Sequence, residues 1–135
     1  MRLWHKDLID VLPRPQLLSQ WRECCCIAKE IAEKGTPNHL LVNKVLGYPE
    51  SHFNTYTLEV YREMMRRGYK CDWDKYSKWR TNTSITSPDE IFTDWHNTRY
   101  LMQCYYNLQE KYDCRGILKE DWVKIQSKIF TQVLI

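Results

Sequence analysis

Proline and glycine divide this chain into pieces of helical length, and this punctuation is the strongest constraint on its fold. Pro13 and Pro15 open a stretch that ends at Gly35, and a second stretch runs from Ser51 to Gly68. Proline is favoured in the first turn of a helix and glycine just past its end. No run of alternating apolar and polar residues is long enough to indicate a sheet. The pattern therefore predicts an all-α fold of about four to five helices.

Length and composition limit the number of domains and the cellular compartment that we expect. A chain of 135 residues with 43% hydrophobic content is long enough for one compact domain, 1–135, and short for two. The N-terminal stretch "MRLWHKDLIDVLP" is interrupted by charged residues and lacks the apolar region of a secretion signal. No stretch approaches the roughly 20 apolar residues that span a bilayer. We expect a cytoplasmic protein without a membrane partner or an obligate protein partner.

Two further segments are predicted in the middle of the chain. Thr36 as N-cap and Pro37 predict a short helix that ends at Gly47. The helix between Ser51 and Gly68 carries apolar residues at helical spacing, which we expect in the core. These are Phe53, Tyr56, Val60, Tyr61 and Met64. Residues 70–84 are polar and irregular, which is typical of a surface loop.

The last third of the chain predicts two more helices. Residues 87–90, "SPDE", form a capping box and predict a long helix that runs to about Tyr112. Gly116 ends it. A final helix begins near Lys119 and presents an apolar stripe to the core. Its members are Trp122, Ile125, Ile129, Phe130 and Val133.

The first helix combines an apolar stripe with a charged pair, Arg22 and Glu23. At 3.6 residues per turn the stripe consists of Leu17, Trp21, Cys24, Cys25, Ala28, Ile31 and Ala32. Glu23 projects almost opposite its centre, and Arg22 lies on the flank. The N-terminal residues include bulky side chains such as Leu3 and Trp4, which need a surface to pack on. If they lie across the first helix, the free α-amine of Met1 comes close to Glu23; otherwise Glu23 is an ordinary solvated side chain.

Cysteines and histidines leave several interpretations open. The net charge is +3 and six cysteines are present, three of them adjacent at residues 24–26. Without a secretion signal we expect free thiols, with Cys24 and Cys25 as small core residues. A zinc-stabilised helical domain is an alternative, although no CxxC pair and no HExxH motif is present. His5 and His96 each follow a tryptophan; we expect partly buried, hydrogen-bonded histidines, and a phosphate contact or proton transfer is the alternative.

A basic edge closes the helix that ends at Gly68. Arg62, Arg66, Arg67 and Lys70 form this edge. They are either a track for phosphates or cations that complement the helix dipole at its C-terminal end. A mildly basic pI near 8.5 is compatible with a nucleic-acid partner.

Two motifs resemble a known family. A short basic N-terminus is followed about twenty residues later by the helical stretch 16–23, "QLLSQWRE", as in the pyrimidine-dimer DNA glycosylases of the endonuclease V type. The stretch 64–70, "MMRRGYK", resembles the helix end of the same family, in which a basic pair precedes glycine and an aromatic residue. The resemblance implies a single-domain, all-α DNA repair glycosylase with associated AP lyase (β-elimination) activity. Its substrate would be pyrimidine dimers or related base damage in duplex DNA, and it would need no cofactor and no metal.

The resemblance also implies roles for four residues. The α-amine of Met1 would attack C1′ of the damaged nucleotide and form an imine, assisted by Glu23. Arg2 and Arg22 match DNA-binding positions that hold phosphates. Two features depart from the family pattern: the bulky Arg2 should prevent removal of Met1, and residues 24–26, "CCC", replace a stretch with proline and another phosphate-binding arginine. A non-catalytic helical DNA-binding protein on the same scaffold is therefore the alternative.

Overall fold

The computed structural model describes residues 1–133 and consists of helices joined by turns, with no strand within that range. The all-α prediction is confirmed. The α-helices are α1 (Arg14–Lys34), α2 (Glu50–Arg66), α3 (Asp74–Ser77), α4 (Thr98–Asp113) and α5 (Lys119–Val133), and the short 3-10 helices are η1 (Lys6–Val11), η2 (Asn43–Gly47) and η3 (Pro88–Glu90). Over the same residues, none of these helices has the length and apolar character needed to cross a bilayer.

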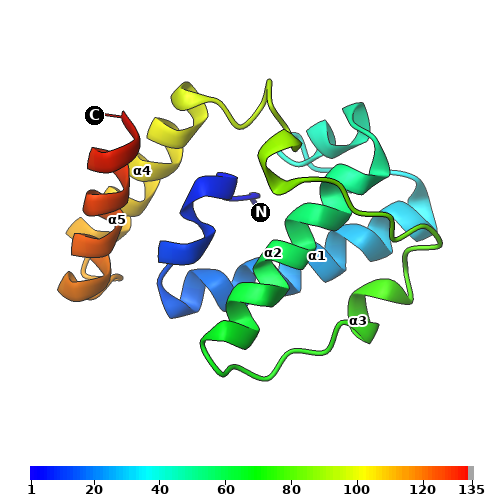
Figure 1. Ribbon diagram of the computed structural model, residues 1–135, viewed down its shortest axis with the longest axis horizontal. Coiled ribbons are helices and arrows are strands. Elements are labelled where there is room, and N and C mark those ends of the chain that lie inside the picture. The colour runs from blue at the N-terminus through cyan, green and yellow to red at the C-terminus, as the bar shows by residue number, and fades with distance from the viewer. Residues whose placement is uncertain (134–135) are drawn as a thin grey trace.

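The N-terminal segment, defined as residues 1–5, and η1 lie between two groups of helices (Figure 1). On one side α1 and α2 pack against each other; on the other, α4 and α5 form a hairpin. The η1 helix contacts both α2 and α5, so it joins the two groups. Leu3, Leu8 and Ile9 are almost fully buried in the hydrophobic core, which runs through both groups. Gln20 and Glu23 of α1 bind the backbone of the N-terminal segment, which therefore packs across the first helix, as the sequence predicts.

The boundaries of α1 follow the predicted punctuation. Pro15 stands in its first turn, and Gly35 ends it with a left-handed φ of 77° and an N–H that donates to Ile31 O. Most of the predicted stripe is buried. Ala32 is exposed, so the stripe ends one residue before the end that the sequence predicts.

The helix predicted from Thr36 is wrong in its start and type. Thr36 Oγ1 accepts from the Asn38 N–H, and Asn38 has a left-handed φ of 53°. The Asn43 side chain then accepts from the His39 N–H. These local bonds compete with helical ones, and only the short η2 forms.

The long helix predicted from residues 87–90 is also wrong in its start. Ser87 makes no side-chain cap, and the chain forms only η3 before it turns at Phe92, whose φ is 50°. The turn carries Phe92 and Trp95 into the core. Asn97 is the actual N-cap of α4, since its side chain accepts from the Tyr100 N–H at 2.9 Å. His96 therefore precedes the helix rather than lying on it.

The final helix, α5, begins at Lys119 as predicted, after Arg115 in a left-handed conformation. Trp122, Ile125 and Ile129 are buried. Phe130 is 56% exposed, so its predicted place in the core is wrong: it falls on the outer side of the stripe.

Candidate active site

The second backbone nitrogen of the chain lies beside Glu23. The Arg2 N–H donates to Glu23 Oε2 at 3.3 Å. The Met1 nitrogen is three covalent bonds from the Arg2 nitrogen, so it lies within about 7 Å of that oxygen. Met1 is 45% exposed and Glu23 is partly exposed, so both groups are accessible from solvent.

Side chains from three parts of the chain hold the backbone of this segment. Gln20 Nε2 donates to Arg2 O (3.0 Å), Tyr100 OH donates to Leu3 O (2.6 Å), the Trp4 N–H donates to Gln20 Oε1 (2.8 Å), and Tyr56 OH donates to Trp4 O (2.6 Å). The sequence pattern predicts no role for Gln20 and only a core position for Tyr56. The available signal was that Gln20 is a polar residue one helical turn before Glu23.

The Arg2 side chain extends toward α4. Its guanidinium lies over the Trp4 ring, 5.5 Å from the ring centre, and Nη1 is 4.0 Å from Cys104 Sγ. Burial raises the pKa of the Cys104 thiol, so the sulfur stays protonated near neutral pH. It does not neutralise the arginine, and the positive charge of Arg2 is retained close to the N-terminus.

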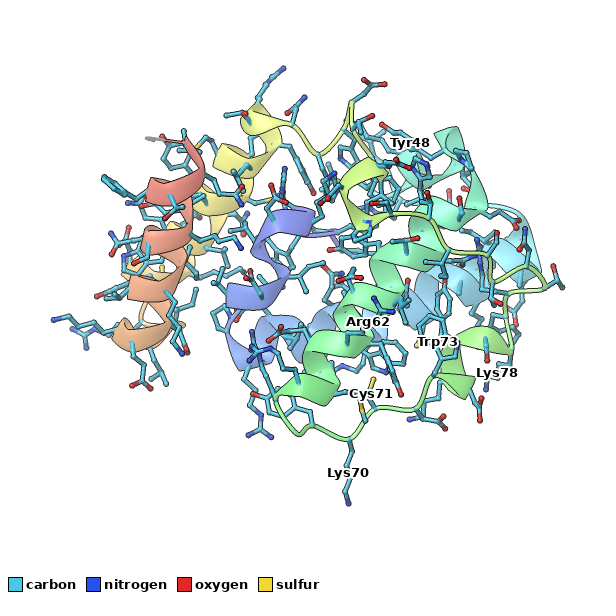
Figure 2. All side chains as sticks on the ribbon, in the orientation of Figure 1. Tyr48, Arg62, Lys70, Cys71, Trp73 and Lys78 are labelled. Atoms are coloured by element: carbon cyan, nitrogen blue, oxygen red, sulfur yellow. The ribbon has the colours of Figure 1, made fainter. Side chains whose placement is uncertain are left out.

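Arg22 lies on a different face of α1 from Glu23, because successive helical residues are about 100° apart. Its Nη2 donates to Ser19 Oγ, and the side chain is exposed. It lines a cavity of about 420 Å³ together with Lys70, Lys75 and the apolar Trp21. Lys70 extends away from the body of the molecule beside this cavity (Figure 2). Two lysines from other segments, with Asp72, thus share this cavity with Arg22.

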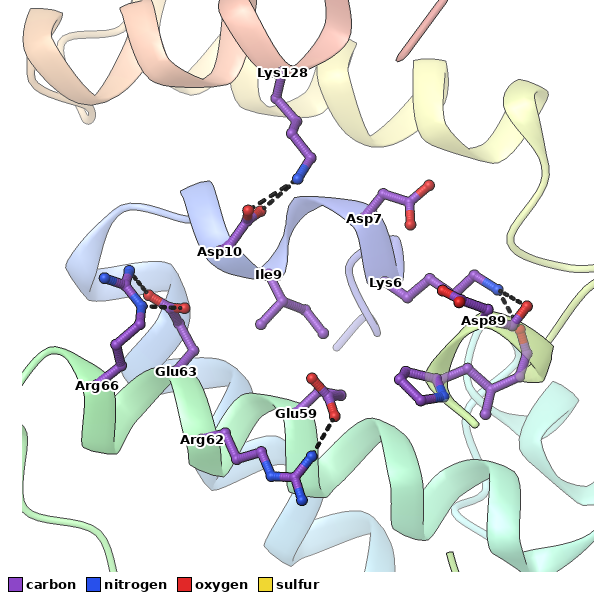
Figure 3. A pocket seen from close by; sticks show the side chains of 12 residues that line it. Lys6, Asp7, Ile9, Asp10, Glu59, Arg62, Glu63, Arg66, Asp89 and Lys128 are labelled. Atoms are coloured by element: carbon purple, nitrogen blue, oxygen red, sulfur yellow. Dashed lines mark hydrogen bonds and ion pairs between the residues drawn. The ribbon is translucent and has the colours of Figure 1, made fainter. Parts of the chain in front are cut away.

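A second cavity, of about 430 Å³, lies between η1 and α2 (Figure 3). The charges around it are largely paired with one another. Lys128 Nζ is 2.9 Å from Asp10 Oδ2, Arg62 Nη1 is 3.2 Å from Glu59 Oε1, and Arg66 pairs with Glu63. We assign no phosphate-binding role to this cavity.

Part of the basic edge has a structural role. Arg67 Nε donates to the buried carboxylate of Glu63 at 2.7 Å, and its Nη1 donates to Leu12 O at 2.7 Å. Burial alone would raise the pKa of Glu63, but the hydrogen bonds and charges of Arg66 and Arg67 outweigh it and lower that pKa. Arg67 therefore ties the end of α2 to the residues that follow η1.

His5 and His96 stack on each other with ring centres 5.0 Å apart, and both are almost fully buried. The Lys6 N–H donates to His96 Nδ1 at 2.9 Å, and the Asp7 N–H donates to His5 Nδ1 at 3.1 Å. Burial lowers the pKa of both histidines. They are neutral at pH 7 and act as acceptors that order the start of η1.

The six cysteines are free thiols in different environments. Cys24 and Cys104 are buried, Cys25 is half-buried, and Cys26 is exposed. Burial raises the pKa of Cys25 to about 11 and that of Cys24 further. Within residues 1–133, no three His, Cys, Asp or Glu side chains gather as a metal site, so the zinc alternative has no set of ligands there.

Comparison with known proteins identifies the family. A family model described as pyrimidine dimer DNA glycosylase matches residues 1–77, more than half of the chain. The chain belongs to the pyrimidine dimer DNA glycosylase family. Neither a curated protein nor a solved structure matches the chain.

The matched region of this glycosylase ends with α3 and contains the N-terminal segment, α1 and α2. It therefore includes Arg2, Gln20, Glu23 and Tyr56, whereas Tyr100 lies beyond it. Family membership implies a DNA repair enzyme that acts on damaged DNA.

Proposed function

We propose that this glycosylase also has AP lyase activity and works through an imine between the Met1 α-amine and C1′ of a damaged nucleotide in duplex DNA. Pyrimidine dimers or related base damage are the proposed substrates. The observation that carries the proposal is the 3.3 Å contact between the Arg2 N–H and Glu23 Oε2 in a chain of this family. It brings the N-terminus and a carboxylate together at the surface.

An α-amine suits this chemistry near neutral pH. The ordinary pKa of an α-amino group is about 7.7–8.0, against about 10.4 for a lysine, so a useful fraction is neutral and nucleophilic. The amine nitrogen bonds to C1′, and the glycosidic bond breaks, with its electron pair leaving on the base. Loss of an amine proton and opening of the C1′–O4′ bond then give the imine.

Glu23 has two roles in the proposal. As a carboxylate it stabilises the positive charge that develops on the sugar and on the protonated imine. It then accepts the acidified C2′ proton. The electrons of that C–H bond form a C2′=C3′ double bond, the C3′–O bond breaks, and the 3′ phosphate leaves on the cut strand.

Arg2 and Arg22 are the proposed phosphate ligands. Arginine binds phosphate bidentately, and such contacts position a duplex without reading its sequence. Arg22 is exposed and lines a cavity together with Lys70 and Lys75. Arg2 keeps its charge beside the amine, where it can contact the phosphate next to the opened nucleotide.

Borohydride trapping tests the proposal. The protein is incubated with an abasic duplex, and separately with a dimer-containing duplex, in the presence of borohydride, which reduces an imine to a stable covalent adduct. We expect an adduct that peptide mapping locates at Met1. A tag that blocks the N-terminus should abolish it.

Glu23→Gln removes the charge at nearly constant shape, and we expect it to block strand cleavage. Glu33→Gln is the matched control, because Glu33 is an exposed carboxylate near the other end of the same helix. Tight binding of the damaged duplex by the wild-type protein with no adduct at any pH from 6 to 9 would contradict the proposal and favour a non-catalytic DNA-binding protein.

A further inference from the structure

Gln20 lies at the centre of the bonds that hold the N-terminal segment. It is fully buried, and both of its polar atoms are used twice. Oε1 accepts from the Trp4 N–H at 2.8 Å and lies 3.0 Å from Tyr56 OH. Nε2 donates to Arg2 O at 3.0 Å and to Glu23 Oε2 at 3.4 Å. The Tyr56 hydroxyl has one proton, which it shares between Trp4 O at 2.6 Å and Gln20 Oε1; the other three positions of the amide have partners of their own.

The partners of Gln20 determine which way its amide points. The oxygen faces a backbone N–H and a hydroxyl, which can donate, and the nitrogen faces a carbonyl and a carboxylate, which can only accept. Reversing the amide would set its NH2 group against the Trp4 N–H and its oxygen against Arg2 O and the Glu23 carboxylate in a buried site. Burial raises the pKa of Tyr56 well above its ordinary value, so its hydroxyl remains a donor.

The same bonds fix the peptide groups on both sides of Arg2. Its N–H is held by Glu23 and its C=O by Gln20. A peptide group is planar, so a fixed Arg2 N–H also fixes the plane that contains the Met1 Cα. Rotation about the Met1 Cα–C bond is then the main remaining freedom of the amine, and it carries the nitrogen around a small circle.

We propose that Gln20 is a positioning residue that sets the spacing between the Met1 α-amine and the Glu23 carboxylate. The inference rests on the proposed function, since that spacing matters only if these two groups react together. Gln20 does not touch the DNA. It acts through the two groups that do, because one amide binds the backbone next to the amine and also the carboxylate.

The chemistry of the side chain makes the role specific to glutamine. A methionine has similar length but none of the four bonds. A glutamate would keep the two acceptor bonds and lose both donors, and it would bring a second carboxylate toward Glu23. Two carboxylates that share a site lose their protons in two separate steps, one of them at raised pH.

Single-turnover trapping on an abasic duplex tests the inference, with Kd for a non-reactive tetrahydrofuran abasic duplex measured in parallel. For Gln20→Met we expect a trapping rate about 100-fold lower, as for a small misplacement of reacting groups, with Kd little changed. For Gln20→Glu we expect the acid limb of the pH–rate profile to move to higher pH. A purely structural role would leave the trapping rate of folded Gln20→Met at the wild-type value.

The matched control is Tyr76→Phe. It removes a buried hydroxyl whose 2.6 Å bond goes to Asn54 Oδ1, away from the N-terminus. It should lower stability but leave the trapping rate unchanged. If Gln20→Met does not fold, Tyr56→Phe takes its place; it removes the hydroxyl that lies beside the Gln20 amide oxygen and donates to Trp4 O.

The outcomes separate the two proposals. No adduct with the wild-type protein overturns the proposed function and this inference together. A wild-type adduct, combined with wild-type trapping rates in folded Gln20→Met or in Tyr56→Phe, overturns the positioning role alone. A lower rate in the variant at an unchanged Kd supports it.

Discussion

The two groups of helices on either side of the N-terminal segment hold it by different means. The α1–α2 side binds it mainly through directed hydrogen bonds from Gln20, Glu23 and Tyr56. The α4–α5 hairpin meets it and η1 through apolar packing, one hydroxyl from Tyr100, and the surface ion pair between Lys128 and Asp10. A hydrogen bond constrains distance and angle, whereas hydrophobic burial is non-directional. Substitutions on the α1–α2 side should therefore lower the reaction rate more than the stability. Substitutions in the α4–α5 hairpin should lower the stability more than the reaction rate.

The largest effect on stability is expected from a substitution that creates a cavity in the hairpin. Ile125 is fully buried in α5, and Ile125→Ala should lower the free energy of unfolding by about 3–4 kcal/mol. Urea unfolding measures the loss. The trapping rate of the folded fraction should stay at the wild-type value. Val123→Ala is the control on the same helix, since Val123 is 48% exposed; a large loss of trapping in Ile125→Ala would contradict the comparison.

The ion pair between Arg67 and Glu63 at the end of α2 tests whether residues of the α1–α2 side that are distant from the site contribute to stability. Arg67→Met leaves the buried Glu63 with one cation fewer and Leu12 O without this donor, which should cost about 3 kcal/mol. Arg62→Met is the control, because its exposed pair with Glu59 should contribute under about 1 kcal/mol. Equal effects of the two substitutions in urea unfolding would show that burial of Glu63 is unimportant.

The stacked histidines predict a pH dependence of stability. Burial lowers the pKa of His5 and of His96 in the folded state, so the unfolded chain binds more protons below its ordinary histidine pKa of about 6.5. Their contribution is complete above that pH and is lost as the pH falls, by at most about 1.4 kcal/mol per pH unit for each ring. Urea unfolding between pH 7.5 and 5.5 measures the slope.

His96→Gln should flatten that slope, because a glutamine oxygen can still accept from the Lys6 N–H without titrating. His39→Gln, on the loop before η2, is the control and should retain the slope. Glu63 does not interfere, because its lowered pKa moves its own loss of stability to more acidic pH. Stability that rises as the pH falls to 5.5 would contradict the buried, neutral state of the two rings.

The smallest effect is expected at Tyr100, whose hydroxyl is the hydrogen-bond donor that the hairpin contributes to the N-terminal segment. Tyr100→Phe removes the donor to Leu3 O and should cost about 1 kcal/mol. Because Leu3 lies beyond the peptide groups fixed by Gln20 and Glu23, the trapping rate should fall less than in Gln20→Met. Thermal unfolding and single-turnover trapping measure the two effects. A larger fall in trapping than in Gln20→Met would shift the positioning role to the hairpin.

Local signals predicted α1, α2 and α5, because those helices depend on proline, glycine and apolar spacing within one element. The placing of the N-terminal segment across α1 was expected because Leu3 and Trp4 need a surface to pack on. The capping box at residues 87–90 does not form: the Glu90 carboxylate accepts from the Thr86 hydroxyl, Thr86 is itself held by Thr55 of α2, and Asn97 caps α4 instead. A local motif cannot reveal a competitor that the tertiary fold provides.

The candidate site was predicted in part, for the same reason. Arg22 and Glu23 were selected by resemblance and by their face of the helix. Gln20 was not, because its role depends on Tyr56, thirty-six positions away, and on a backbone that folds back over it. Nothing in the helical pattern separates a buried polar residue with four partners from a solvated one.

The three adjacent cysteines of α1 differ in solvent exposure although they lie within one helical turn. Cys24, Cys25 and Cys26 are buried, half-buried and exposed in that order. With Cys114→Ser removing the other exposed thiol, a maleimide fluorophore would attach first at Cys26, one turn from Glu23. A dye there would report the arrival of a duplex by its emission, while delayed labelling of Cys24 would time the opening of the core.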